Sequence, residues 1–199
     1  KKIMTSSVLF TFLSFLPVDH ILPFPSIQAA NADGSTTRFV LPPVDTKDKG
    51  RCQFKSSAMG QANAARDKLY DLRLCDMGGK DAGGFDLSGV IASETNFAGT
   101  NFQEAILSKA YLKKSNFIDA DFSNAVVDRV TFEGSNLKNA QFNNAVLSGT
   151  SFADANLENT DFSETYMGEF DLAKLCKNPT LKGENPFTGL PSRESAGCR

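Results

Sequence analysis

Several residue types on which enzymes depend are scarce in this sequence. It has no tryptophan and one histidine, His20, so residues 33–199 lack the side chain that most often acts as a general acid or base near neutral pH. The serines therefore have no histidine base, and the paired glycines lack the spacing of a phosphate-binding loop. We expect a protein that is not an enzyme, with no catalytic residues and no cofactor.

Charge of neither sign is in excess. The chain has 21 lysines and arginines against 23 aspartates and glutamates, for a net charge of −2. Without a strong basic bias it lacks the electrostatic footprint of a protein that binds nucleic acid. We therefore expect no nucleic-acid partner.

An uninterrupted apolar run of membrane-spanning length is also missing. Two lysines precede the apolar run 8–16, and residues 27–32 offer the small residues of a cleavage site. This order predicts an export or targeting segment over 1–32, with cleavage after Ala32. A membrane anchor is the alternative, but Pro17 and Asp19 interrupt the run well short of the roughly 20 apolar residues that a span requires. We expect no stable membrane insertion after processing.

Four cysteines lie outside this segment: Cys52, Cys75, Cys176 and Cys198. An even number in an exported chain favours disulfides, whereas the wide spacing and the lack of histidine speak against a metal site. The simplest pairing is local, Cys52 with Cys75 and Cys176 with Cys198. Each bridge would then contribute roughly 3 kcal/mol in the chain-entropy model. Four cysteines allow three pairings, and the sequence does not choose among them.

What the chain does contain is an unbroken step of five. Each fifth residue over eighteen units is apolar: Leu87, Ala92, Phe97, Phe102, Leu107, Leu112, Phe117, Phe122, Val127, Phe132, Leu137, Phe142, Leu147, Phe152, Leu157, Phe162, Met167 and Leu172. The residue two positions before each of them is in most units small. A period of five fits neither a helix nor a flat strand, so it indicates a repeat architecture over 85–174.

The segments around the repeat have different compositions. Residues 33–56 are broken by prolines and predict an extended lead-in. In 57–84, alanines and leucines at three- and four-residue steps predict a helix over 57–74, and two glycine pairs then predict a linker. The tail 175–199 is rich in proline and glycine and predicts mostly loop.

Individual units such as Ala120-Asp121-Phe122-Ser123-Asn124 resemble those of the pentapeptide-repeat family. The resemblance implies an all-β fold, a right-handed quadrilateral parallel β-helix in which each unit forms one side and eighteen units make about 4.5 coils. The central apolar residue and the small residue two before it would point inward. The open ends of such a solenoid need caps, and we expect the helix at 57–74 to cover one end and a disulfide-closed tail to cover the other.

A second, longer period of twenty residues independently supports a coil with four sides. One side has phenylalanine at 102, 122, 142 and 162, and another has asparagine at 96, 116, 136 and 156. Stacked coils place such residues above one another at about 4.8 Å. We therefore expect a column of stacked rings inside and a ladder of amides outside.

One set of outward positions is apolar where other units are polar. Ile106, Val126, Val146 and Tyr166 share one side, with Ile91 and Tyr111 on the adjacent side. Stacking would join them into a continuous stripe. Either the lead-in, with Phe39-Val40-Leu41, covers this stripe, or the stripe is a candidate surface for a protein partner or for self-association.

The leader, the cysteine-bearing segment before the repeat and the tail together resemble pentapeptide-repeat proteins of the plant thylakoid lumen, of the seventeen-kilodalton class. The resemblance implies a chloroplast location in the thylakoid lumen and a non-enzymatic role as a protein-binding or scaffolding module. The alternative is a regulatory protein switched by a capping disulfide, with thioredoxin-type lumen proteins as partners. A third hypothesis, a DNA mimic that inhibits a nucleic-acid enzyme, is weaker, because 85–174 carries thirteen acidic and six basic residues, a modest excess.

Overall fold

The computed structural model describes residues 41–48, 50–56 and 70–198. The chain divides into two compact units, Lys1–Pro42 and Pro43–Arg199. The β-helix belongs to the second unit. Within the described ranges, no helix is long and apolar enough to cross a membrane.

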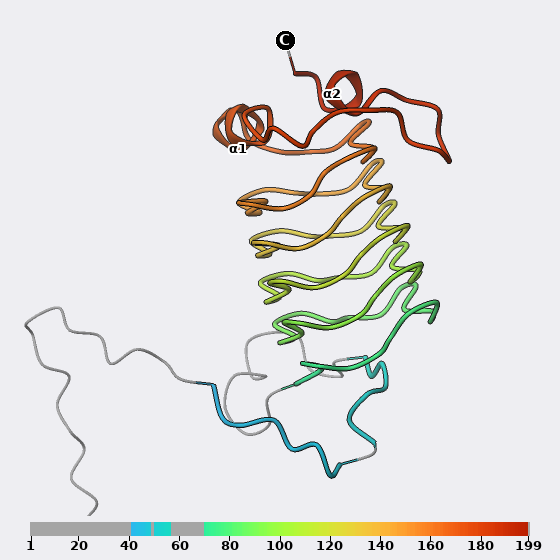
Figure 1. Cartoon of the computed structure of the whole chain (residues 1–199), viewed down its shortest axis with the longest axis vertical. Helices are drawn as coiled ribbons and strands as arrows, with labels where there is room; N and C mark the ends of the chain where they lie inside the picture. The colour runs from blue at the N-terminus through green and yellow to red at the C-terminus, as the bar shows by residue number, and fades with distance from the viewer. Residues whose placement is uncertain (1–40, 49, 57–69, 199) are drawn as a thin grey trace, which may run out of the picture. The chain divides into compact units, whose positions relative to one another are not determined.

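The second unit is a stack of four-sided coils (Figure 1). From Asp71↔Ile91 to Val146↔Tyr166, every fifth residue forms a parallel bridge with the residue twenty positions further on. An offset of twenty with a step of five means four units per coil. The expected quadrilateral parallel β-helix is thus confirmed, with sides made of single-residue bridges rather than longer strands.

Each five-residue unit consists of a short extended stretch and a tight corner. In the stretch, Asp121 donates its N–H to Thr100 O of the preceding coil at 3.1 Å, and Phe122 donates to Gln141 O of the following coil at 2.7 Å. At the corner, Asn124 has φ 60°, a left-handed conformation that asparagine and glycine tolerate best. Asparagine or glycine recurs at many of these corner positions, and the other corners adopt the same conformation with charged residues or, at Leu74, leucine.

The interior is built as the period predicts. Phe122 is fully buried, and its ring centroid lies 4.8 Å from that of Phe102 and 4.7 Å from that of Phe142, all nearly parallel. The small inward residues leave room for these rings, and most of those with a hydroxyl group donate it to the previous coil. Thr95 Oγ1, for example, donates to Leu72 O at 2.7 Å.

The expected amide ladder is present on the outside. Asn156 donates to Asn136 Oδ1 at 3.0 Å, and Asn116 donates to Asn96 Oδ1 at 3.1 Å. The ladder ends at Asp76, whose Oδ1 accepts from Asn96 at 2.8 Å. A carboxylate can only accept, so it terminates the donor–acceptor chain at the first coil.

The repeat begins earlier than predicted. The ladder starts at Asp71, so the expectation of helix over 70–74 and of a linker over 75–84 is corrected; the part of that helix at 57–69 lies outside the described residues. The glycine pairs before residue 85 form corners instead of stopping a helix, with φ 65° at Gly79 and 68° at Gly84. Leu72, Met77 and Ala82 continue the inward apolar step.

The repeat also ends one unit earlier than predicted. Leu172 does not form an eighteenth rung, because it lies in helix α1, Glu169–Leu175. The central positions therefore run from Leu72 to Met167, which gives five full coils instead of 4.5. A second short helix, α2, Ser192–Ser195, and an antiparallel bridge between Glu184 and Pro191 complete the C-terminal cap.

Candidate functional site

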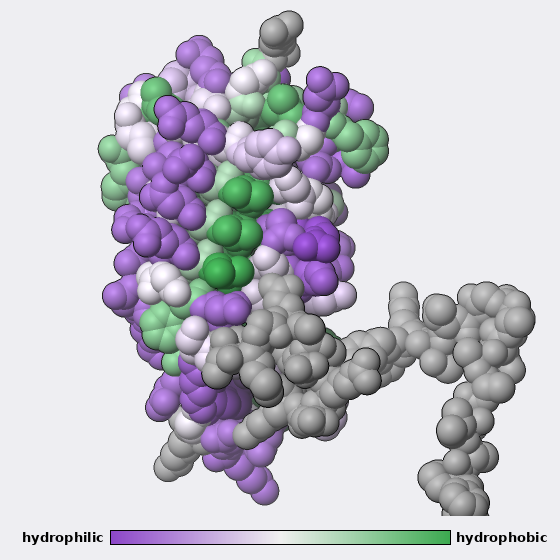
Figure 2. Space-filling model, turned by 180° about the vertical axis from the view of Figure 1, so that it is seen from behind, coloured by the Kyte–Doolittle hydropathy of each residue, from purple (hydrophilic) through white to green (hydrophobic). Residues whose placement is uncertain are grey.

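The apolar stripe lies on one side of the β-helix. Ile106, Val126, Val146 and Tyr166 pair with one another in successive coils, and the backbone N–H of Val126 and Tyr166 donates to the preceding coil at 2.9 Å in both cases. Ile106 is 38% exposed and Tyr166 71%, while the two valines are half-buried. Figure 2 shows such an apolar column crossing the coils between polar residues.

The two residues predicted on the adjacent side behave differently. Tyr111 is 55% exposed and extends the apolar surface around the corner. Ile91 does not belong to that surface, which corrects the prediction: it stands between Asp71 and Tyr111 in its ladder and is only 6% exposed. The cover that the lead-in would provide lies largely outside the described residues, because Phe39 and Val40 are among those not described.

A neutralised charge cluster borders the stripe. Asp128, at the corner after Val127, accepts hydrogen bonds from the Ser108 hydroxyl and from Arg129 Nε, the latter at 2.8 Å. Burial raises the pKa of the Asp128 carboxyl, but the hydrogen bonds from Ser108 and Arg129 outweigh it, so that the pKa is lowered overall. The corner therefore presents a compensated ion pair, and the stripe itself remains the distinctive chemical feature of this face.

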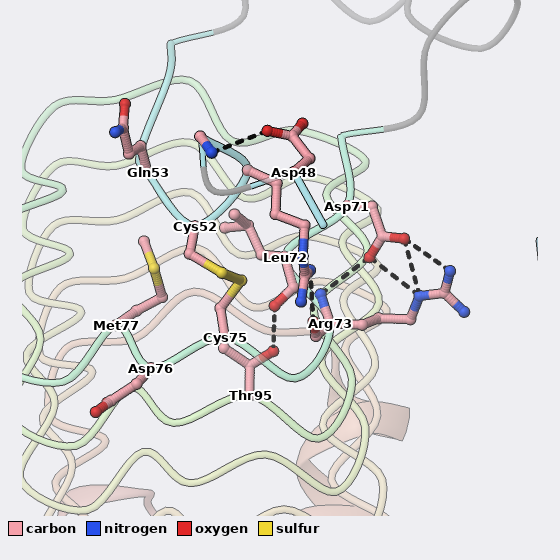
Figure 3. The surroundings of a disulfide bond; sticks show 12 residues. Asp48, Cys52, Gln53, Asp71, Leu72, Arg73, Cys75, Asp76, Met77 and Thr95 are labelled. Carbon is pink, nitrogen blue, oxygen red and sulfur yellow. Dashed lines mark hydrogen bonds and ion pairs between the residues drawn. A yellow bond between two sulfur atoms is a disulfide. The ribbon is translucent and has the colours of Figure 1, made fainter. Parts of the chain in front are cut away.

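Four cysteines form two disulfides by the local pairing. Cys52 bonds to Cys75 and Cys176 to Cys198, with a Cα–Cα distance of 5.5 Å in each. The first ties the segment before the repeat to the first coil (Figure 3). The second joins the residue after α1 to the chain beyond α2.

The described part of the N-terminal cap includes an irregular segment, 50–56, with a turn and bends over 50–53. Arg51 Nη1 donates to Arg73 O at 2.7 Å, and Tyr70 Oη donates to Gln53 O at 3.0 Å. Ser56 Oγ accepts the N–H of Asp86 at 3.1 Å, whereas the equivalent N–H of Ile106 donates to Phe85 O of the preceding coil. The segment thus supplies to the first coil contacts that a further coil would otherwise make.

Phe54 closes the core at this end, a role that the sequence reasoning missed. Its ring lies 6.3 Å from Phe97 in a stacked arrangement and 6.0 Å from Phe102 edge-on. It therefore continues the column of rings by one further member, although it lies outside the repeat. The available signal was an aromatic residue two positions after the cysteine that pins the segment to the coil.

An ion pair stands beside this disulfide. Arg73 donates to both carboxylate oxygens of Asp71, through Nη2 at 2.7 Å and Nε at 3.0 Å (Figure 3). Burial raises the pKa of Asp71, but the hydrogen bonds from Arg73 more than compensate and lower it. The stabilisation is complete above the ordinary pKa of an aspartate, and it is lost as the pH falls from there through the lowered value.

The C-terminal cap uses side chains to pair the last coil. Thr180 Oγ1 accepts the N–H of Leu157 at 2.8 Å, and Ser195 Oγ accepts that of Phe162 at 3.0 Å. The amide of Asn185, which is fully buried, donates to Asn159 O at 2.8 Å. Sequence reasoning placed a cap here without finding these residues, because single polar residues in an irregular tail carry no periodic signal.

Gly183 in this cap has no room for a side chain. Its φ is 85°, and a Cβ there would lie 2.0 Å from Asn159 Oδ1. We expect Gly183→Ala to lower the free energy of unfolding by about 1–3 kcal/mol. Chemical denaturation would measure this, with Gly79→Ala as the control: its φ is also positive, but no atom lies within 4 Å of the added Cβ. Equal losses in the two variants would show that the contact with Asn159 is unimportant.

The described residues offer binding surfaces rather than reactive groups. No three histidine, cysteine, aspartate or glutamate side chains in this part of the chain come together as a metal site requires. All four cysteines are oxidised, so the structure contains no free thiol.

Comparison with known proteins agrees with the geometry. Residues 85–162 match the family model of the pentapeptide repeat region. This segment is a pentapeptide repeat. The family model describes a repeat region and indicates no enzyme family.

Several solved pentapeptide-repeat structures are similar to the chain. One is a thylakoid-lumen pentapeptide repeat protein of Arabidopsis thaliana, 28% identical over 64% of this chain and 91% of that one, with a TM-score of 0.42. Another, from the cyanobacterium Cyanothece, is 18% identical over 50% of this chain and 84% of its own, with a TM-score of 0.29. A plasmid-mediated fluoroquinolone resistance protein, QnrB1, is 15% identical over 53% and 84%, with a TM-score of 0.18. No curated protein sequence matches the chain.

Proposed function

We propose that the protein is a non-enzymatic binding or scaffolding module whose apolar stripe docks a protein partner. The observation that carries this proposal is the exposure of Ile106 and Tyr166 at a position of the unit that the other sides mostly fill with polar residues. Each stripe residue is fixed by backbone hydrogen bonds to the neighbouring coil, so the surface is ordered before any partner arrives. Preorganised apolar side chains lose little entropy on binding.

We propose the thylakoid lumen as its location. The order of basic, apolar and small residues in 1–32 is that of a targeting segment. Two disulfides and no free thiol among the described residues suit an oxidising compartment better than a reducing one. The partner would then be a lumen protein with a complementary apolar face.

A redox-responsive role is the second candidate, favoured by the position of the disulfides. The first fastens the segment before the repeat to the first coil, and the second closes the C-terminal cap on itself; Cys52, Cys176 and Cys198 are all partly exposed. A thioredoxin-type partner would have to open one of these bonds under mild conditions. Partner binding that changes on such reduction supports this role; binding and melting temperature that stay constant reject it.

The stripe predicts a specific loss of binding. Val126→Asp combined with Val146→Asp would place two carboxylates in the middle of it, and we expect at least a tenfold loss of partner capture from lumen extract. The fold tolerates aspartate at this position of the unit, as Asp121 shows one side away. Affinity capture followed by quantification of the bound protein measures the loss.

Thr131→Asp is the matched control, since it lies at the same position of the unit on the adjacent side. It should leave capture unchanged, and all three proteins should melt at similar temperatures. Capture that survives the valine substitutions, or that falls equally in the control, would reject the stripe as the binding surface.

A further inference from the structure

The C-terminal cap does not pair every side of the last coil. On two sides it provides acceptors for the coil: Thr180 Oγ1 and Lys182 O for one, and Ser195 Oγ for the next. On the side that ends at Phe152, the next rung would fall at Leu172, which lies in α1. There Leu172 donates its N–H to Gly168 O at 3.0 Å and accepts from Cys176 N–H at 2.9 Å, so it does not extend the ladder.

The backbone groups left over form a defined pattern. One coil earlier, Ser151 donates its N–H to Val130 O, and its own carbonyl accepts from Phe132, both at 2.9 Å. Ala153 O likewise accepts from Gly134 at 2.9 Å.

The equivalent groups on the last rung are Thr150 C=O, Phe152 N–H and Asp154 N–H. In the part of the chain that the structure describes, none of the three has a hydrogen-bond partner.

The residues that carry these groups line a groove of about 640 Å³ between the last coil and the cap. Phe152 lies in its lining, half-buried, and stacks on Phe132 below with a centroid distance of 5.5 Å. Leu175 of α1 and Pro179 line the groove as well. The groove thus combines an aromatic surface with an open ladder edge.

We propose that this groove binds an extended peptide segment of a partner protein as one additional rung of the β-helix. The first peptide residue would donate its N–H to Thr150 C=O and accept from Phe152 N–H. The third would accept from Asp154 N–H, and the apolar or aromatic side chain between them would stack on Phe152. This is strand addition to a sheet edge, with backbone hydrogen bonds for affinity and one pocket for selectivity.

The charges around the groove do not favour a strongly acidic or basic peptide. Two lining carboxylates, Asp154 and Asp171, are matched by two ammonium groups, Lys174 and Lys177. Asp171 is already engaged, since its Oδ2 accepts the N–H of Gly149 at 2.8 Å. Backbone pairing and the central side chain therefore determine which segment binds.

Amide hydrogen exchange followed by NMR tests the proposal directly. The probe is a synthetic peptide with the sequence of residues 150–155, blocked at both ends. In the free protein, the amides of Phe152 and Asp154 should exchange fast, whereas those of Leu157 and Asn159, which the cap already pairs, should be protected. Saturating peptide should slow exchange at Phe152 and Asp154 at least tenfold and leave Leu157 and Asn159 unchanged.

Two controls separate the groove from non-specific binding. The same peptide N-methylated at its serine cannot donate to Thr150 C=O and should bind at least tenfold more weakly. Ala153→Trp, within the groove lining, should weaken binding, while Gln103→Trp, at the same position of a distant unit, should not.

Unchanged exchange at Phe152 and Asp154, protection of these amides in the free protein, or equal binding of the methylated peptide would each overturn the proposal. The variant that combines Val126→Asp with Val146→Asp should bind the peptide normally. A negative result for peptide binding in the groove can therefore be told apart from a negative result for partner binding at the stripe.

Discussion

Phe122→Ala is expected to lower the free energy of unfolding by about 3–5 kcal/mol. The ring is fully buried at the middle of the phenylalanine column, with neighbours stacked on both faces at 4.7 and 4.8 Å. The coils are held apart by backbone hydrogen bonds on both sides, so they cannot collapse into the space that the ring leaves. The cost then includes a cavity as well as lost apolar burial. Urea denaturation followed by circular dichroism measures it.

Tyr111→Ala is the matched control for Phe122. It removes an aromatic ring of similar size from the outside of the rod, where the side chain is 55% exposed. We expect a change within about 0.5 kcal/mol there, as for most surface substitutions. A loss below 1 kcal/mol for Phe122→Ala would mean that the stacked column is not what stabilises the coils.

Removal of the C-terminal disulfide is the second large effect. Cys176→Ser with Cys198→Ser opens a bridge across 22 residues of sequence, and the chain-entropy model gives a loss of about 3 kcal/mol. The tail beyond Cys176 would detach from the last coil more often, because it would then be held only by buried Leu181 and Ala196 and by single hydrogen bonds such as that from Leu157 to Thr180. Thermal denaturation measures the loss of stability.

Hydrogen exchange shows where this effect acts. The amides of Leu157, Asn159 and Phe162 bond to the cap and should exchange faster in the double serine variant. Phe97, which bonds to Asn116 O near the other end, should be unaffected. If stability fell and all these amides changed together, the rod would unfold as one unit and the cap would not be a separate element.

The interior of the rod could be predicted because it is periodic. A step of five fixed which residues point inward, and a step of twenty fixed which of them stack, so Phe102, Phe122 and Phe142 were placed in one column from the sequence alone. The asparagine ladder followed from the same register. The local pairing of the cysteines was the simplest of three that the sequence left open, and the structure contains that pairing.

The ends could not be predicted, because their signals are ambiguous or aperiodic. Glycine pairs stop helices and also form corners, so Gly78-Gly79 and Gly83-Gly84 concealed three units of the repeat. Leu172 continued the step of five, but it lies in α1 instead. Contacts such as Phe54 with Phe97 depend on where the chain returns after an irregular segment, and no local pattern encodes that return.

The candidate site was predicted in position but not in extent. The side chains of Ile106 and Tyr166 are exposed where the longer period places them, whereas Ile91, at an equivalent position of its unit, is nearly covered. The register of the repeat alone determines which side chains point outward. Exposure depends also on the neighbouring side chains, and these differ between the two sides that carry Ile91 and Ile106.

Covalent footprinting in lumen extract tests most directly whether the stripe is an interface. Reagent labelling of Ile106 and Tyr166 should be strong in the isolated protein, and it should fall at least fivefold in the extract as a partner covers them. Phe187, which is 58% exposed on a loop of the C-terminal cap, provides the internal reference and should stay labelled. Labelling of the stripe that is the same with and without extract, or that falls in step with Phe187, would contradict a protein-binding role for this surface.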